Sequence, residues 1–145
     1  MKISQALTDA SSQRVRSLRS ASRIALSALF MASGTYHFAN SGFYVRMTPA
    51  YMPWPLALVQ ISGAAELVLG LALLIPRVAR LAAWGLIALL VAVYPANIQM
   101  ARHPETFPEF SVAMLWARLP LQFLLIAWAW GYARKYRPGP GHSAR

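Results

Sequence analysis

Four stretches of the chain are long and apolar enough to cross a lipid bilayer as helices. Lipid cannot hydrogen-bond an exposed backbone, so such a span needs about twenty mostly apolar residues in helical form. Of the 145 residues, 57% are hydrophobic and 12% are charged, whereas soluble domains carry about 25% charged residues. The sequence therefore predicts an all-α fold, an integral membrane four-helix bundle. The predicted spans are residues 22–40, 54–75, 78–99 and 112–133.

The basic residues predict how these spans are oriented. Basic loops stay in the cytoplasm. Residues 1–21 form a basic tail, two arginines flank the turn between the second and third spans, and residues 134–145 form a second basic tail. Only Arg46 and Arg102 lie in the loops on the opposite side, beside Glu105 and Glu109. Both termini are therefore expected in the cytoplasm, in a multi-pass protein of the plasma membrane.

The N-terminal segment has a rival interpretation. A basic lead followed by an apolar run and the small residues 32–34 is also typical of a cleaved signal peptide, or of an organelle transit peptide. The apolar run continues through Thr35, Tyr36 and Phe38, which is longer than a signal core needs. A membrane span is the preferred interpretation, and N-terminal sequencing of the mature protein would test it.

Composition restricts the cofactors and partners. The chain has no cysteine, which excludes thiolate catalysis, iron–sulfur ligation and most zinc sites, and no metal site is expected. His103 and His142 lie outside the predicted spans, so His37 has no second histidine with which to hold a haem. The formal net charge is +10, but the bases flank apolar segments. Anionic lipid headgroups are therefore expected as partners, and nucleic acid is not.

Polar residues inside the predicted spans gather in their outer halves. Ionisable groups at membrane depth are costly, so they usually face the bundle interior and have partners. The inner halves are almost entirely Leu, Ala, Ile and Val. This asymmetry predicts a small polar cavity that faces the outer side. Its candidate ligand-binding residues are His37, Gln60, Glu66, Asn97, Arg118 and Gln122.

Glu66 needs a partner at mid-membrane depth, and Arg118 is the expected one. An arginine at hydrogen-bond distance would keep the carboxylate ionised and can bind both of its oxygens. The pair is interpreted either as a lock that fixes helix register or as part of a functional site. His37 has two interpretations as well, a hydrogen-bonded packing residue or a ligand. Ser62, Glu66 and Gly70 share one helix face, which is expected to pack inward.

Several motifs in a fixed order resemble those of one known family. They are GTYHF at 34–38, TPAYMPWPLALVQISGAAE at 48–66, LLIPRVAR at 73–80, YPANI at 94–98 and RLPLQ at 118–122. Together they resemble the DoxX family of small four-span bacterial membrane proteins, over residues 32–133. The resemblance implies a bundle in the bacterial inner membrane and an association with quinone-linked oxidoreductases. It carries His37, Glu66, Asn97 and Arg118 over as site residues.

Three functions are weighed from these observations. The first is a redox-associated subunit that binds a quinone in the outer cavity, has no intrinsic cofactor, and takes part in catalysis only within an oxidoreductase complex. Its redox centre would come from a membrane partner. The second is a non-catalytic assembly or scaffolding protein in which the buried Glu/Arg cluster is a lock. The third is a transporter for a weak acid, which would need homo-oligomers and lacks polar residues in the inner halves.

Overall fold

The computed structural model describes residues 2–134, without the side chains of residues 2–4 and 6–9. The described residues form helices joined by short connecting segments, and no strand occurs among them. The elements are α1 (Lys2–Ala39), α2 (Ser41–Met47), α3 (Pro55–Leu74), α4 (Ala79–Arg102), the 3-10 helix η1 (Pro104–Thr106) and α5 (Val112–Ala133). The all-α prediction is confirmed.

Three of the helices have the length and composition of membrane spans, namely α3, α4 and α5. Their bounds differ by at most three residues from three of the predicted segments. Many of their large apolar side chains point away from the protein, among them Ile61, Leu81 and Leu124, each at least 66% exposed. Such surfaces are expected where helices face lipid rather than water. The chain is therefore a helical membrane protein.

Local sequence explains where these helices begin and end. Pro55 begins α3, where the missing N–H of proline is harmless, and Trp54 before it has a left-handed backbone with φ of 51°. Pro76 follows directly after α3 and its C-cap Ile75. The Ser111 hydroxyl accepts a hydrogen bond from the Met114 backbone N–H at 3.3 Å and caps α5.

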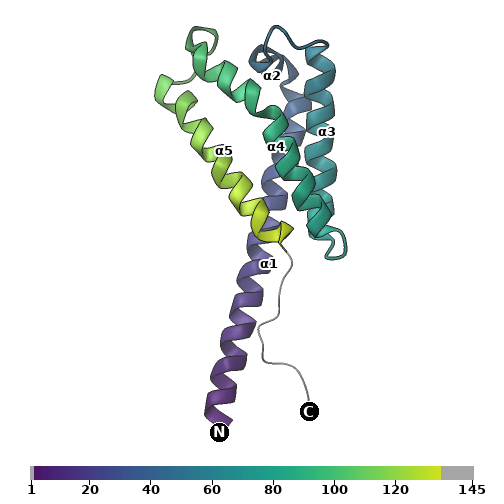
Figure 1. Cartoon of the computed structure of the whole chain (residues 1–145), viewed down its shortest axis with the longest axis vertical. Coiled ribbons are helices and arrows are strands. Elements are labelled where there is room, and N and C mark those ends of the chain that lie inside the picture. The colour runs from purple at the N-terminus through teal and green to yellow at the C-terminus, as the bar shows by residue number, and fades with distance from the viewer. Residues whose placement is uncertain (1, 135–145) are drawn as a thin grey trace.

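The helix α1 is far longer than the predicted first span. Residues 2–21, predicted as a basic tail, continue the same helix, so α1 has 38 residues and a length of about 57 Å. Neither glycine nor proline occurs before Gly34, so nothing in the sequence interrupts it. In Figure 1 its N-terminal half extends beyond the other helices, and residues 10–21 are exposed.

The helices α1 and α3 pack antiparallel along the length of α3. Gly34 faces Gly63 so closely that a Cβ on Gly34 would lie 2.6 Å from the Gly63 carbonyl oxygen. Seven residues before Gly34 in α1 and seven after Gly63 in α3, the Ser27 hydroxyl donates to the Gly70 carbonyl at 2.6 Å. Small residues thus allow the two backbones to approach, as is common between membrane helices. The expected inward packing of the Glu66 face is confirmed for Glu66 and Gly70, which are buried.

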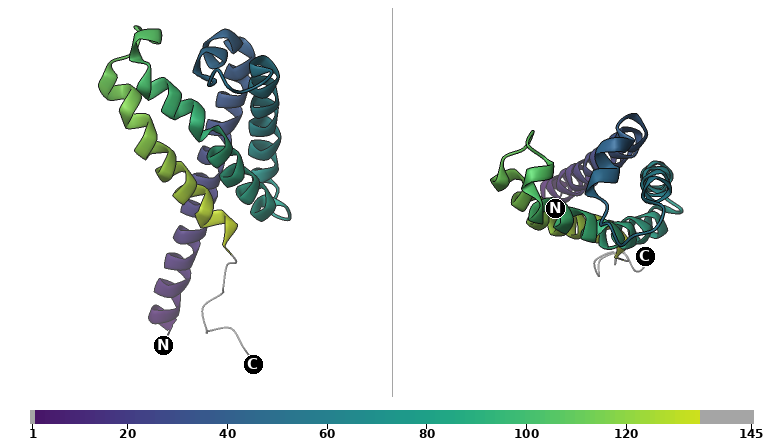
Figure 2. Two further views of the ribbon diagram at one scale, coloured as in Figure 1. Left: turned by 45° about the horizontal axis from the view of Figure 1, so that its top comes forward. Right: turned by 90° about the horizontal axis from the view of Figure 1, so that it is seen from above.

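The pair formed by α4 and α5 leans away from the pair formed by α1 and α3. Figures 1 and 2 show that the two pairs are close at the end where α5 finishes and separate toward α2. At the close end, the Trp128 indole donates to the Ser22 hydroxyl at 2.9 Å, and the Tyr132 hydroxyl donates to the Arg19 carbonyl at 3.1 Å. An apolar core fills this end; it includes Leu26, Phe30, Leu73, Ala83, Leu86 and Ala129.

The helix α2 connects the two pairs at their separated end. Its Met47 packs with Met100, Phe107 and Leu115 in a second apolar cluster. Arg46 donates to Glu109 at 2.8 Å and to the Thr106 carbonyl at 3.1 Å. The protein is thus closed at one end by its core and covered at the other by α2, and the space between them holds the site.

Candidate functional site

A cavity of about 510 Å³ lies between the two helix pairs, below α2. Side chains such as Phe30, Leu90 and Leu125 form its apolar floor, and Met47 and Met52 belong to its roof. Five of the six predicted site residues meet or approach one another here: His37, Glu66, Asn97, Arg118 and Gln122 all line it. A mostly apolar pocket with a few converging polar groups is the usual form of a small-molecule site.

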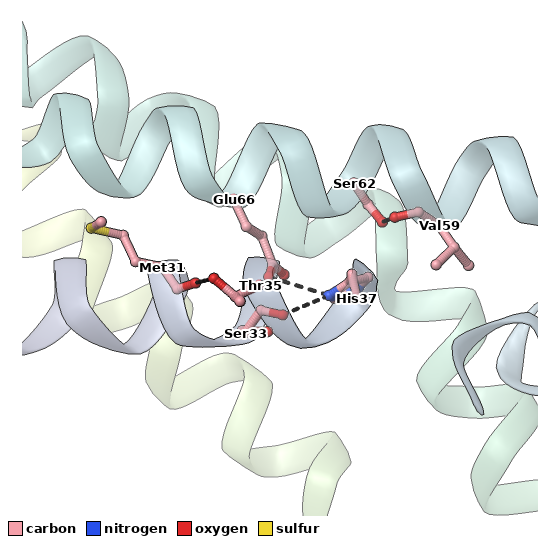
Figure 3. Close-up of polar contacts among 7 residues, drawn as sticks. All are labelled: Met31, Ser33, Thr35, His37, Val59, Ser62 and Glu66. Atoms are coloured by element: carbon pink, nitrogen blue, oxygen red, sulfur yellow. Dashed lines mark hydrogen bonds and ion pairs between the residues drawn. The ribbon is translucent and has the colours of Figure 1, made fainter. Parts of the chain in front are cut away.

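The polar side chains on the α1–α3 side are His37 and Glu66. The His37 Nδ1 lies 2.9 Å from the carbonyl oxygen of Ser33, one turn earlier in α1, so this nitrogen carries the proton and donates it. The Glu66 Oε2 lies 3.6 Å from the same nitrogen and has no hydrogen-bond partner among the described residues. Figure 3 shows Glu66 reaching from α3 toward His37 on α1. Both residues are buried, at 7% and 6% exposure.

The position of His37 is fixed from two sides. A Cβ placed on Gly63 would lie 2.7 Å from the His37 Cβ, so α3 holds the base of the side chain. The Tyr44 ring of α2 stacks on the imidazole with centroids 3.7 Å apart and an interplanar angle of 19°. With Nδ1 occupied by the Ser33 carbonyl, Nε2 is the imidazole nitrogen available to a ligand.

Ser33 and Tyr44 belong to the site although the sequence did not indicate them. Both line the cavity, and the Ser33 hydroxyl interacts with the Glu66 carboxylate and with the Tyr44 phenol. Burial, with a smaller contribution from the Glu66 carboxylate, raises the pKa of the Tyr44 phenol, so this residue stays protonated and can donate. The position of Ser33 one helical turn before His37 could have indicated that it belongs to the site. Nothing in the sequence around Tyr44 indicated the same for that residue.

The polar side chains on the opposite wall are Asn97 of α4 and Gln122 of α5. The Asn97 amide donates to the Gln122 side-chain oxygen, and the Gln122 amide donates to the Leu90 backbone carbonyl. Leu90 lies in the turn before Pro95, a proline inside α4 that locally disturbs the helical hydrogen bonds. Gln122 is buried at 3% exposure, and its side-chain oxygen and nitrogen each make a hydrogen bond, whereas Asn97 is half-buried and lines the cavity.

The expected ion pair between Glu66 and Arg118 is not formed. Both residues are within the described part of the chain, and the ionisable group near Glu66 is the His37 imidazole instead. The guanidinium of Arg118 contacts the Met100 sulfur at 3.5 Å and lies 5.7 Å from the centre of the Phe110 ring. The physical reason is the separation of the helix pairs: Glu66 packs against α1, while Arg118 lies in the N-terminal part of α5, on the other pair.

Gln60 is the predicted site residue that the structure does not bring to the cavity. The buried face of α3 consists of Val59, Gly63, Glu66, Gly70 and Leu73. Gln60 lies off that face, is exposed, and takes no part in lining the cavity. The described residues also contain no group of three or more His, Cys, Asp or Glu side chains suited to hold a metal ion.

Comparison with known proteins gives a family for this arrangement. Residues 26–133 match the model of a family described as a domain of unknown function, DUF8561. The chain belongs to the DUF8561 family. The matched region of this DUF8561 protein includes every residue that lines the cavity and leaves out the N-terminal extension of α1. No curated protein and no solved structure matches the chain, and the resemblance to the DoxX family stays an expectation.

Proposed function

We propose that this DUF8561 protein is a four-span protein of the bacterial inner membrane, with the second half of α1 as its fourth span. The support is that this half packs antiparallel along α3, itself a candidate span, from Ser27 at one end to His37 at the other. Large apolar side chains of the same half, such as Ile24 and Leu29, are 58% and 44% exposed, which suits a lipid-facing surface.

In this arrangement both chain termini face the cytoplasm. The end of the bundle near the α3–α4 turn carries Arg16, Arg19, Arg77, Arg80 and Arg134, and anionic lipid headgroups are their expected partners. The end near α2 carries the ion pair of Arg46 with Glu109 and exposes Glu105. The cavity below α2 is then close to the outer surface.

Single-cysteine variants test this topology, since the natural chain has no cysteine. Gly42→Cys places a thiol on α2, where nothing lies within 4 Å of the added Cβ. Ser17→Cys places one on the exposed N-terminal part of α1. We expect an impermeant maleimide to label Gly42→Cys in intact cells and to label Ser17→Cys only after the membrane is opened. The reverse pattern would contradict the proposed orientation.

We propose further that the cavity binds the head of a quinone as part of a redox-associated complex. The single observation that carries this proposal is the cavity itself, in which hydrogen-bonding groups of α1, α4 and α5 face a largely apolar space. A quinone needs hydrogen bonds to its two carbonyl oxygens and an apolar passage for its tail. Leu58, Ile61 and Ala92 line the cavity and are also exposed on the lipid-facing sides of α3 and α4, which provides such a passage.

The polar side chains would have distinct roles toward this ligand. The Asn97 amide and Arg118 guanidinium would donate to one quinone carbonyl, and a protonated His37 Nε2 to the other. Glu66, at 3.6 Å from the His37 Nδ1, stabilises that protonated imidazole. The chain has no cysteine, so a membrane redox partner would supply the electrons, as the DoxX resemblance implies.

Binding of a soluble benzoquinone with a short alkyl tail tests the cavity directly. We expect Asn97→Ala to weaken binding about tenfold, the size expected for a lost hydrogen bond in a site shielded from water. Glu66→Gln removes the charge that favours protonated His37 while keeping the side-chain shape, so its effect should grow as the pH rises. Gln60→Ala is the matched control, because Gln60 is exposed and takes no part in lining the cavity.

A scaffolding role is the second candidate, and one observation favours it. His37 and Glu66 lie at a close contact of α1 with α3, where Gly34 and Gly63 face each other. A pair at such a place can serve as a lock that fixes the register of α1 on α3. If Asn97→Ala and Glu66→Gln fold normally and bind the quinone as the wild type does, the quinone proposal fails and the lock remains.

A further inference from the structure

A second hollow, the outer vestibule, lies above the cavity on the α2 side. Its volume is about 360 Å³, and its polar lining residues are Tyr36, Asn40, Tyr44, Arg46, Glu109 and Arg118. Two phenylalanines of the neighbouring aromatic cluster, Phe43 and Phe110, complete it. Tyr44 and Arg118 also line the cavity, so these two side chains form the boundary between the two spaces.

The charges in the vestibule do not cancel. Glu109 is paired with Arg46 at 2.8 Å, and a second nitrogen of Arg46 donates to the Thr106 carbonyl at 3.1 Å. Arg118 has no carboxylate within ion-pair distance among the described residues; its polar contact is the weakly accepting Met100 sulfur. The vestibule therefore has two guanidinium groups and one carboxylate, which leaves one uncompensated positive charge.

The remaining polar groups of the vestibule can donate hydrogen bonds. Tyr44 stays protonated because burial raises its pKa, and Asn40 and Tyr36 contribute an amide and a second phenol. Arg118 is half-buried, so its charge is less screened by solvent than one on the open surface. A guanidinium in such a setting binds an oxyanion through two parallel hydrogen bonds.

We propose that the outer vestibule binds one phosphate group, with Arg118 as the principal ligand and Tyr44 as a supporting donor. The inference goes beyond the quinone proposal, since a neutral quinone leaves the charge of Arg118 uncompensated. Two sources can present the same phosphate chemistry: the headgroup of a phospholipid in the outer leaflet and a free small phosphate. The size of the vestibule suits either one.

The test uses the full chain in a neutral, phosphate-free detergent and two probes. Inorganic phosphate represents the free source, and a short-chain phosphatidylglycerol represents the lipid source. Saturable broadening of the ³¹P NMR signal reports binding of each probe. We expect the wild type to bind at least one of them and Arg118→Gln to bind it at least tenfold more weakly, because a charge-assisted bidentate contact is lost. Binding of the lipid alone would assign the site to a headgroup.

Matched variants separate a specific site from general attraction to a basic protein. Arg102→Gln removes an arginine that is exposed beyond the vestibule, so it should leave the affinity unchanged. Arg118→Lys keeps the positive charge but lacks the planar guanidinium that makes two parallel hydrogen bonds, so its affinity for phosphate should lie between those of the wild type and Arg118→Gln. Tyr44→Phe keeps the ring stacked on His37 and should weaken binding several-fold. Tyr44→Phe therefore tests the vestibule site even if Arg118→Gln does not fold.

Three results would overturn the proposal: no saturable binding of either probe by the wild type, unchanged affinity in both Arg118→Gln and Tyr44→Phe, or an equal loss in Arg102→Gln. Because Arg118 lines both spaces, quinone titration of the wild-type protein separates this proposal from the proposed function. Binding of phosphate without quinone would support the vestibule site and contradict the quinone proposal. Binding of quinone without phosphate would support the quinone proposal and contradict the vestibule site.

Discussion

Replacing Gly34 by alanine is expected to lower the free energy of unfolding by about 1–3 kcal/mol, the usual cost of overpacking a close contact. The new Cβ would lie 2.6 Å from the Gly63 carbonyl oxygen and 2.9 Å from the Leu67 Cγ. The first of these atoms is backbone and cannot rotate away, so α1 must move off α3. Equilibrium unfolding in mixed micelles, followed by helical circular dichroism, measures the change.

Gly131→Ala is the matched control for this prediction. Gly131 lies in α5, and a Cβ added there has nothing within 4 Å. Alanine in a helix is favoured over glycine by about 0.5–1 kcal/mol, so this variant should be as stable as the wild type or slightly more stable. Equal destabilisation by both variants would mean that the contact between α1 and α3 is not as close as described.

Replacing Gln122 by leucine is expected to destabilise the protein by about 1–3 kcal/mol, since two hydrogen bonds between α4 and α5 are lost. The Asn97 amide loses its acceptor, and the Leu90 carbonyl loses the hydrogen bond that it accepts from Gln122, one turn before Pro95. Leucine fills a similar volume, so the effect reports the polar network rather than a void. The same unfolding measurement applies.

Gln60→Leu is the natural comparison, because it makes the same chemical change on an exposed surface of α3. A leucine facing lipid is expected to leave the stability unchanged or to raise it slightly. If Gln122→Leu proves as harmless as Gln60→Leu, the network on the α4–α5 wall does not contribute to holding that wall together.

These three spans were predictable from the sequence because a membrane span depends on the apolar composition of its own segment and not on contacts with other helices. Segments 54–75, 78–99 and 112–133 correspond to α3, α4 and α5 within three residues at each end. Continuous apolar composition, Pro55 at the start of α3 and Pro76 just after its end are visible without any tertiary information. The helix α2 was not predicted, since seven residues rich in aromatics carry no clear periodicity.

The partner of Glu66 was not predictable in the same way. Depth along the membrane placed Arg118 and Glu66 within possible contact, but depth does not say which helices are neighbours. Glu66 packs against α1 through the contact of Gly34 with Gly63, and this contact brings His37 to it instead. The small residues one heptad apart on both helices were the available signal for that pairing.

The polar residues that line the cavity lie on two different helix pairs. Glu66 is placed where α1 and α3 touch, while Asn97 and Arg118 lie across the cavity on the other pair of helices. The apolar end of the bundle fixes the separation of the two pairs through Leu26, Leu73 and Leu86. The apolar core at the end where α5 finishes therefore holds the helices together, and the cavity with its polar side chains lies toward α2.

Extraction from the native membrane is the first experiment to make on the proposal that the cavity holds a quinone. The protein is purified gently, extracted with organic solvent and analysed by mass spectrometry, in parallel with Asn97→Ala. We expect quinone close to one per chain in the wild type and a strong loss in the folded variant. Quinone no more abundant than in the surrounding lipid, or equal amounts in both samples, would contradict it.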